Sequence, residues 1–178
     1  AALPEKVDLL VLSVDAQQAT AAVTEIADTQ KAESVIVIPG GLEEKAGTED
    51  FVGKMHAALR ASRGTPWGGP VVNGGNCLGI RSIPGRYDTM FIAPYKIGLP
   101  DKEPAPLAVI AQSGAWSISK NNKVSCLNPL YTISFGNQMD LTVGDYLAYL
   151  KNDPAVDIFA VYVEGFKDND GLEFSRAV

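Results

Sequence analysis

The sequence predicts an α/β fold in which parallel strands alternate with helices. Two observations support this class: apolar runs of strand length, and segments between them in which apolar residues recur at helical spacing. The pattern occurs in residues 1–83 and again in residues 107–178, on either side of a junction over residues 84–106 with repeated prolines and no sustained periodicity. Each half follows the order strand, helix, strand, helix, strand, which predicts two adjacent parallel sheets with right-handed crossovers.

The first half opens on a near-continuous apolar run over residues 7–14. Such a run is typical of a parallel strand that is covered on both faces, so we expect an interior strand. Asp15 is a candidate N-cap for the following helix, whose alanine, valine and isoleucine side chains recur at helical spacing as far as Ala27. The rest of this half predicts a buried strand, a helix that stops at Gly64 and a short strand, over residues 34–39, 51–63 and 71–73.

The second half repeats this alternation once the prolines end. The predicted strands cover residues 107–111, 131–135 and 156–163. Helices are predicted to begin at about Gly114, at Thr142 and at Gly171. Thr142 and Asp145 have the spacing of a capping box, although aspartate stands where glutamate is preferred.

Composition narrows the classes of function. With 178 residues, 46% of them hydrophobic, the chain can bury a substantial core, which excludes a disordered protein. A net charge of −6 without a basic run disfavours nucleic acid as a partner. Because the sequence has no apolar stretch of membrane-spanning length and no signal-peptide pattern, we expect no membrane partner and a place in the cytoplasm or an organelle matrix.

Metal-binding residue types are scarce. The cysteines are Cys77 and Cys126, and His56 is the single histidine. These are too few for a disulfide framework or for most zinc sites, and any metal would need carboxylate ligands. We therefore expect no metal to be bound by this chain.

The first site candidate is the segment Gln112-Ser113-Gly114-Ala115, where an apolar strand ends and a helix is expected to start. A helix start presents unpaired backbone N–H groups and the positive end of the helix dipole. Ser113 and Gly114 would let an anion of phosphate size approach with little steric resistance. The same residues also suit a purely structural role, since serine caps helices and glycine turns the chain.

Four phrases in a fixed order carry a family resemblance. They are Gly75-Asn76-Cys77-Leu78-Gly79, Ala111-Gln112-Ser113-Gly114-Ala115, Phe135-Gly136-Asn137-Gln138-Met139-Asp140 and Tyr162-Val163-Glu164-Gly165. Together they resemble the NDP-forming acyl-CoA synthetases, which are relatives of the succinyl-CoA synthetase alpha subunit. The resemblance implies the rear part of a Rossmann-like CoA-binding domain over residues 1–83 and the front part of a flavodoxin-like ligase domain over residues 107–178, hence an excised part of a longer enzyme.

The resemblance also implies an activity. Enzymes of this kind interconvert acyl-CoA, ADP and phosphate with carboxylic acid, CoA and ATP, through acyl phosphate and phosphohistidine intermediates. Coenzyme A is then a substrate, while ATP or ADP and Mg²⁺ are expected to bind outside this chain, on an ATP-grasp subunit or domain. The phosphorylated histidine is expected outside the chain as well, since His56 falls in the wrong domain and is expected at the surface. We expect an oligomer, and we expect this chain alone to be inactive.

The resemblance also implies roles for individual residues in the matching phrases. The resemblance implies that Gln112, Ser113, Gly114 and Ala115 hold the phosphoryl group, and that Glu164 contacts the catalytic histidine and orients its ring. It implies contact with CoA for a second set of residues: Gly40, Gly41, Leu42, Asn76 and Cys77. Judged without the resemblance, Glu164 is a solvated acid at a strand end, the glycines form an ordinary loop, and Cys77 is a small buried hydrophobe.

Two other classes of function remain open. One is a non-catalytic CoA- or acyl-CoA-binding regulatory module of an acyltransferase-type protein, which would need no phosphoryl site. The other is a nucleotide-binding Rossmann domain or a flavodoxin-type redox domain. The sequence has no Gly-x-Gly-x-x-Gly fingerprint, which disfavours this second class.

Overall fold

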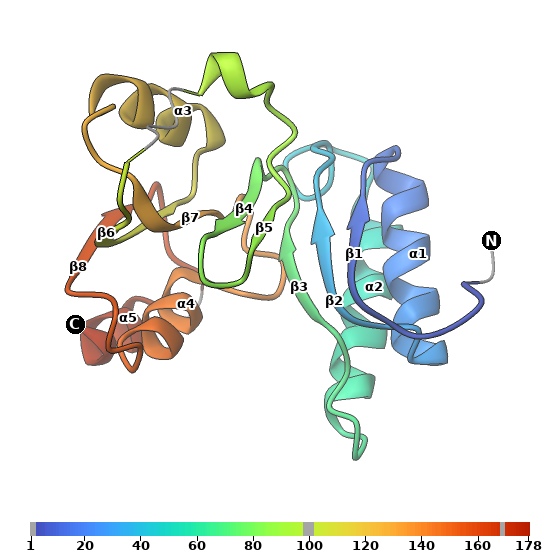
Figure 1. Cartoon of the computed structure of the whole chain (residues 1–178). Coiled ribbons are helices and arrows are strands. Elements are labelled where there is room, and N and C mark those ends of the chain that lie inside the picture. The colour runs from blue at the N-terminus through green and yellow to red at the C-terminus, as the bar shows by residue number, and fades with distance from the viewer. Residues whose placement is uncertain (1–2, 98–101, 168–169) are drawn as a thin grey trace.

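The computed structural model describes residues 3–97, 102–167 and 170–178, and it contains two sheets that lie side by side (Figure 1). The first sheet has the order β1-β2-β3, and all of its pairings are parallel. Its strands are β1 (Val7–Leu12), β2 (Ala32–Val37) and β3 (Val71–Gly74). The helices α1 (Ala16–Thr29) and α2 (Glu49–Arg63) pack against each other and against this sheet, as the predicted alternation requires.

The second sheet has the order β5-β4-β7-β6-β8. Its three parallel strands are β6 (Ala105–Ala111), β7 (Pro129–Ser134) and β8 (Ile158–Tyr162), which confirms the predicted strands of the second half. The helices α3 (Gly114–Lys123), α4 (Val143–Leu150) and α5 (Asp170–Ala177) alternate with them. Among the described residues, no helix is both long and apolar enough to cross a membrane.

This second sheet is mixed, whereas we expected parallel strands alone. The short strands β4 (Gly79–Ser82) and β5 (Tyr87–Asp88) join it in antiparallel orientation. We expected residues 79–82 in the first half, but Gly79 pairs with Ser134 of β7. A four-residue strand carries no local signal of which sheet it joins, because pairing depends on residues far away in the chain. The predicted junction also contains a single helical turn, η1 (Pro94–Lys96), while its residues 98–101 lie outside the described residues.

Within this chain, β1 does not have the interior position that we expected for residues 7–14. β1 pairs with β2 and forms one edge of the first sheet in the described structure. Val11 is 41% exposed, although Leu12 is buried in the core. An apolar run indicates which faces of a strand are apolar, but it does not indicate how many neighbouring strands pair with it.

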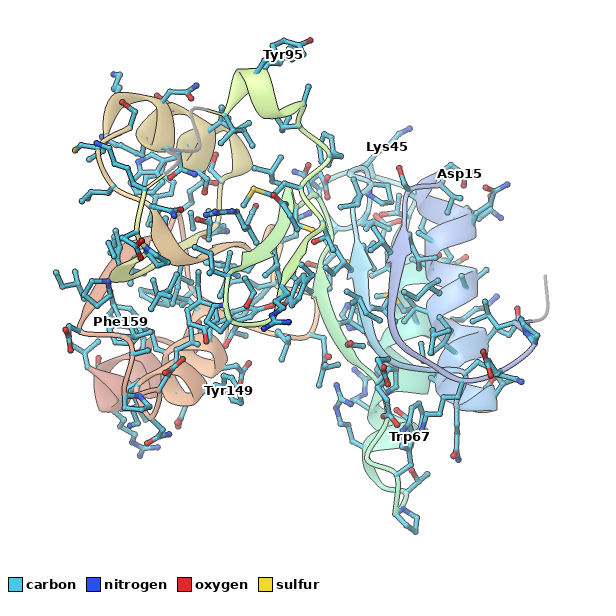
Figure 2. The ribbon with its side chains drawn as sticks, in the orientation of Figure 1. Asp15, Lys45, Trp67, Tyr95, Tyr149 and Phe159 are labelled. Atoms are coloured by element: carbon cyan, nitrogen blue, oxygen red, sulfur yellow. The ribbon has the colours of Figure 1, made fainter. Side chains whose placement is uncertain are left out.

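Local signals for helix ends are confirmed. The Asp15 side chain accepts a hydrogen bond from the backbone N–H of Gln18 at 2.9 Å and caps α1, at the end of that helix where Figure 2 labels it. Thr142 and Asp145 form the predicted capping box at the start of α4, and Gly64 is the C-cap of α2. These features depend on residues three or four positions apart, which is why they can be predicted from the sequence.

A short antiparallel ladder joins the two sheets. The backbone N–H groups of Asn137, Met139 and Leu141 donate to the carbonyl oxygens of Gly75, Gly74 and Val72, at 2.8, 2.8 and 3.1 Å. The Asp140 carboxylate strengthens this seam because it accepts from the backbone N–H of Val72 and from the Arg63 guanidinium. The carboxyl end of β3 is thereby held against the turn that follows β7.

Candidate functional site

The site lies where the strand order of the second sheet reverses. The chain passes from β6 to β7 on one side, and then from β7 to β8 on the other side of β6. The carboxyl ends of β6 and β8 therefore flank a topological switch point, where open α/β sheets bind ligands. A cavity of about 380 Å³ opens at this place, and it is lined by Asn76, Cys77, Leu78, Phe91, Ile92, Gln112, Ser113, Gly114, Ala115, Ile118, Gly136, Asn137 and Glu164.

The start of α3 forms one wall of the cavity. Ser113 is the N-cap, and its hydroxyl oxygen accepts a hydrogen bond from the backbone N–H of Trp116 at 3.3 Å. Trp116 stacks on Tyr162 at the end of β8, with ring centroids 4.7 Å apart, which fixes the helix start against the sheet. Since the first amides of a helix have no partner within it, the N–H groups of Gly114 and Ala115 are placed to face an anion.

Only glycine fits at position 114, because the backbone of the helix start lies close to Leu78. A Cβ atom at this position would lie 2.8 Å from Cβ of Leu78, which is closer than side-chain atoms pack. Leu78 is itself fixed, because its backbone N–H donates to the Ser134 hydroxyl at 3.0 Å. Glycine thus lets the helix start press against the segment between β3 and β4 while remaining half-buried. Both the serine and the glycine stay accessible from the cavity.

Glu164 follows β8 and lines the same cavity as the helix start. Its side chain is exposed, and its backbone is held by Gln112. The side-chain oxygen of Gln112 accepts from the backbone N–H groups of Glu164, at 2.8 Å, and of Gly165, at 3.2 Å. The structure therefore brings together the predicted phosphate-binding segment and the predicted acid. Gln112 and Glu164 are 52 positions apart in the sequence.

Two turns, at Asn76 and at Gly136, form another wall of the cavity. Gly136 has a φ of 60° and Asn76 a φ of 52°, and both line the cavity. A Cβ atom on Gly136 would lie 2.8 Å from the carbonyl oxygen of Asn76, so only glycine allows the two turns to meet. Asn137 extends this wall toward the loop after β2.

The loop predicted to contact CoA is placed next to this wall rather than inside the cavity. Among the residues that we assigned to CoA contact, Asn76 and Cys77 line the cavity, whereas Gly40, Gly41 and Leu42 do not. Leu42 is fully buried in the core of the first half. Gly40 lies close to Asn76, because a Cβ atom on Gly40 would be 3.1 Å from the Asn76 side-chain oxygen.

Glu44 occupies the amides of that loop, a role that sequence reasoning missed. Its carboxylate accepts from the backbone N–H of Gly41 at 2.6 Å, from that of Leu42 at 3.2 Å, and from the Asn137 side chain at 2.6 Å. Burial opposes ionisation of this carboxyl, but these hydrogen bonds outweigh burial and lower the pKa of Glu44. No local motif marks Glu44, since its partner Asn137 is 93 positions away.

His56 lies in a different cavity. Its ring nitrogen Nε2 is 2.9 Å from the Glu43 carboxylate, which also pairs with Lys167 at 2.6 Å. The hydrogen bond from His56, aided by Lys167, lowers the pKa of Glu43 against the effect of burial. His56 is half-buried and makes this contact at the surface, and it does not line the cavity beside Ser113.

The electrostatics of the cavity rest on backbone dipoles. Among the lining residues that the structure describes, none is lysine or arginine, and Glu164 is the charged one. An anion would therefore be held by amide N–H groups and by the helix dipole. Within residues 3–97, 102–167 and 170–178, no three His, Cys, Asp or Glu side chains cluster in a way that could hold a metal ion.

Cys77 should resist thiol reagents, in line with its expected role as a small buried hydrophobe. It is 4% exposed, and burial raises the pKa of its thiol to about 12, so the reactive thiolate is strongly disfavoured at pH 8. Exposed Cys126 is the internal control. With iodoacetamide at pH 8, we expect alkylation by mass spectrometry at Cys126 alone, and Cys126→Ser should abolish the fast reaction. Rapid alkylation of Cys77 in the folded protein would contradict its burial.

Comparison with known proteins finds a family model and several relatives that this chain resembles. Residues 104–178 match the family model described as the succinyl-CoA ligase like flavodoxin domain. Over 98% of its length the chain is 32% identical to acetate–CoA ligase (ADP-forming) I of Archaeoglobus fulgidus, of which it covers 24%. Over 93% of its length it is 29% identical to the alpha subunit of acetate–CoA ligase (ADP-forming) I of Pyrococcus furiosus, of which it covers 34%. The chain thus spans about a quarter to a third of these relatives.

Solved structures have the same fold. The apo form of the dinucleotide forming acetyl-coenzyme A synthetase 1 from Ca. Korarchaeum cryptofilum matches with a TM-score of 0.79 at 25% identity, over 98% of this chain and 36% of that one. The structure of that enzyme in complex with phosphate and ADP matches with a TM-score of 0.80 at 24% identity, over 98% of this chain and 35% of that one. The arrangement of both sheets is therefore shared with these structures.

Proposed function

This chain belongs to the NDP-forming acyl-CoA synthetase superfamily, and we propose that it supplies the CoA-binding and phosphoryl-transfer part of an ADP-forming acyl-CoA ligase. The reaction converts acyl-CoA, ADP and phosphate into carboxylic acid, CoA and ATP, and it is reversible. The match of residues 104–178 to the ligase domain and the names of both relatives support this proposal. The chain spans 24% and 34% of these relatives, so the activity is assigned to the whole protein and we expect this chain alone to be inactive.

One observation carries the proposal: the start of α3 and Glu164 line the same cavity at the switch point. In the proposed sequence, phosphate displaces CoA from acyl-CoA to give an acyl phosphate. A histidine then takes the phosphoryl group and releases the carboxylic acid, and ADP finally takes the group from the histidine. The charge of the transferring group would fall beside the amides of Ser113, Gly114 and Ala115, at the positive end of the α3 dipole.

Glu164 would act on the histidine. A carboxylate beside one ring nitrogen holds the tautomer in which the other nitrogen is the nucleophile. His56 is the single histidine of the chain, and it lies in a separate cavity with Glu43. We therefore assign the phosphorylated histidine to another segment or subunit of the whole protein, which would enter the cavity opposite Ser113.

CoA would bind along the loop after β2 and the turn at Asn76. Because Glu44 occupies the amides of Gly41 and Leu42, we assign direct contact with CoA to Gly40 and to the side chain of Asn76. Leu42 and Cys77 are buried, so their contribution would be to shape the two turns. Gly41 would support the loop through its bond to Glu44, so the exposed residues Gly40 and Asn76 are separated from those that support them.

The remaining parts belong to the whole protein. We propose an ATP-grasp subunit or domain for ATP or ADP and Mg²⁺, as the resemblance to this superfamily implies. The relative from Pyrococcus furiosus is named as an alpha subunit, which supports an assembly of subunits. We also propose a cytoplasmic or organelle-matrix location.

The experiment uses the full-length protein that carries this chain. Incubation with γ-³²P-ATP and Mg²⁺ should give an acid-labile, base-stable phosphohistidine, and CoA with a carboxylic acid should discharge it. Glu164→Gln should reduce its formation at least tenfold, about 1.4 kcal/mol, while leaving the melting temperature unchanged. A protein that binds CoA but never forms phosphohistidine would contradict the proposal and would favour a regulatory CoA-binding module.

A further inference from the structure

Gln112 extends the pairing of β6 and β8 beyond their last residues. The regular ladder ends where Ala111 pairs with Tyr162. The backbone N–H of Gln112 then donates to the Tyr162 carbonyl at 2.9 Å, and its side-chain oxygen accepts from the N–H groups of Glu164 and Gly165. A single side chain therefore takes the place of the next pair of backbone hydrogen bonds, at the point where the two strands diverge toward the cavity.

These bonds settle how the Gln112 carboxamide is turned. Two backbone N–H groups can face its oxygen but not its NH₂ group, so the oxygen is on the side of Glu164. The NH₂ group, on the other side of the carboxamide, is the end left to face an occupant of the cavity that Gln112 lines. The hydroxyl of the neighbouring Ser113 is already used as an acceptor by Trp116.

We propose that Gln112 is a positioning residue that couples the occupancy of the anion site to the placement of Glu164. Its oxygen holds the backbone that carries Glu164, and its NH₂ group donates to an anion bound at the start of α3. This inference deepens the proposed function and rests on it for the identity of the anion. A phosphoryl group that pulls on the NH₂ group polarises the carboxamide and strengthens the bonds at its oxygen.

The coupling is reciprocal. If a bound anion strengthens the hydrogen bonds between the Gln112 oxygen and the amides of Glu164 and Gly165, a variant that lacks these bonds must bind the anion more weakly. The dissociation constant rises by the same factor by which the anion stabilises the bonds. The rate of hydrogen exchange at the Glu164 and Gly165 amides measures how strongly the Gln112 oxygen holds them. The dissociation constant of inorganic phosphate measures the anion affinity of the site. A residue that merely supported the fold would leave exchange at these two amides insensitive to phosphate.

The test compares two substitutions of nearly equal size in this chain. Gln112→Glu keeps an oxygen for the amides of Glu164 and Gly165 but has no NH₂ donor, whereas Gln112→Met has neither. In the wild type, saturating phosphate should slow exchange at both amides at least threefold. Gln112→Glu should keep the protection seen without phosphate and lose the response. Its phosphate affinity should also fall at least tenfold, partly because its carboxylate repels the anion, so the donor role is judged by the exchange response at saturating phosphate. Gln112→Met should speed exchange at both amides at least tenfold, while the amide of Ile110 within β6 stays protected.

The outcomes separate this inference from the proposed function. Wild-type protection of Glu164 and Gly165 in Gln112→Met would overturn the positioning role, and a phosphate response that persists in Gln112→Glu would overturn the donor role. If the wild type shows no phosphate response at all, the coupling is refuted. Phosphohistidine formation in the full-length protein would still decide the proposed function by itself.

Discussion

Gly136→Ala should destabilise the protein by about 3 kcal/mol or more, although the substitution removes no side-chain contact. Gly136 has a φ of 60°, and a Cβ atom there would collide with the Gly75 carbonyl oxygen and lie 2.8 Å from the Asn76 carbonyl oxygen. All of these are backbone atoms that cannot rotate away. For a domain of this size, we expect the midpoint of thermal unfolding to fall by about 6–12 °C.

Gly53→Ala is the matched control for that prediction. Gly53 lies within α2, and a Cβ atom there would meet no heavy atom within 4 Å. Alanine is a better helix former than glycine, so this variant should gain up to about 1 kcal/mol. Measured by thermal unfolding, equal effects of the two substitutions would show that the two turns do not meet at Gly136.

Ala115→Glu should abolish most anion binding without harming the fold. Ala115 is exposed on the cavity side of the first turn of α3. A carboxylate at this position repels phosphate across a few ångströms, and we expect phosphate affinity to fall at least tenfold, about 1.4 kcal/mol. The same charge interacts favourably with the helix dipole, so stability should stay level or rise by up to about 1 kcal/mol.

Ala115→Gln separates charge from size in this experiment. Glutamine has the shape of glutamate without its charge, so phosphate affinity in isothermal titration calorimetry should stay within threefold of wild type. Added salt should restore part of the affinity lost in Ala115→Glu, because it screens exposed charges. Undiminished phosphate binding by Ala115→Glu would mean that the anion binds elsewhere.

Features that depend on neighbouring residues were predictable from the sequence. The cap at Asp15, the capping box at Thr142 and the helix start at Gly114 are all confirmed, because each is decided within one helical turn. Features decided by pairing were not predictable in this way. β1 is an edge strand and β4 joins the second sheet, and neither segment contains residues that specify its partner.

The candidate site likewise combines residues that could be predicted with contacts that could not. Family resemblance pointed to Gln112, Ser113, Gly114 and Glu164, and the structure places them around one cavity. The role of Glu44 could not be foreseen, because its bond to Asn137 crosses between the two halves of the chain. The direction of the Gln112 side chain was also beyond prediction, since its partners are backbone amides after a different strand.

The central claim is that the start of α3 binds a phosphoryl-sized anion in the cavity that Glu164 also lines. Titration of the ¹⁵N-labelled chain with inorganic phosphate tests this most directly, because each backbone amide reports separately. We predict that the amides of Ser113, Gly114 and Ala115 show the largest shift changes, with one shared dissociation constant, and that those of Gly41 and Leu42 stay unchanged. The largest changes at Gly41 and Leu42, or changes spread over the surface without saturation, would contradict the claim.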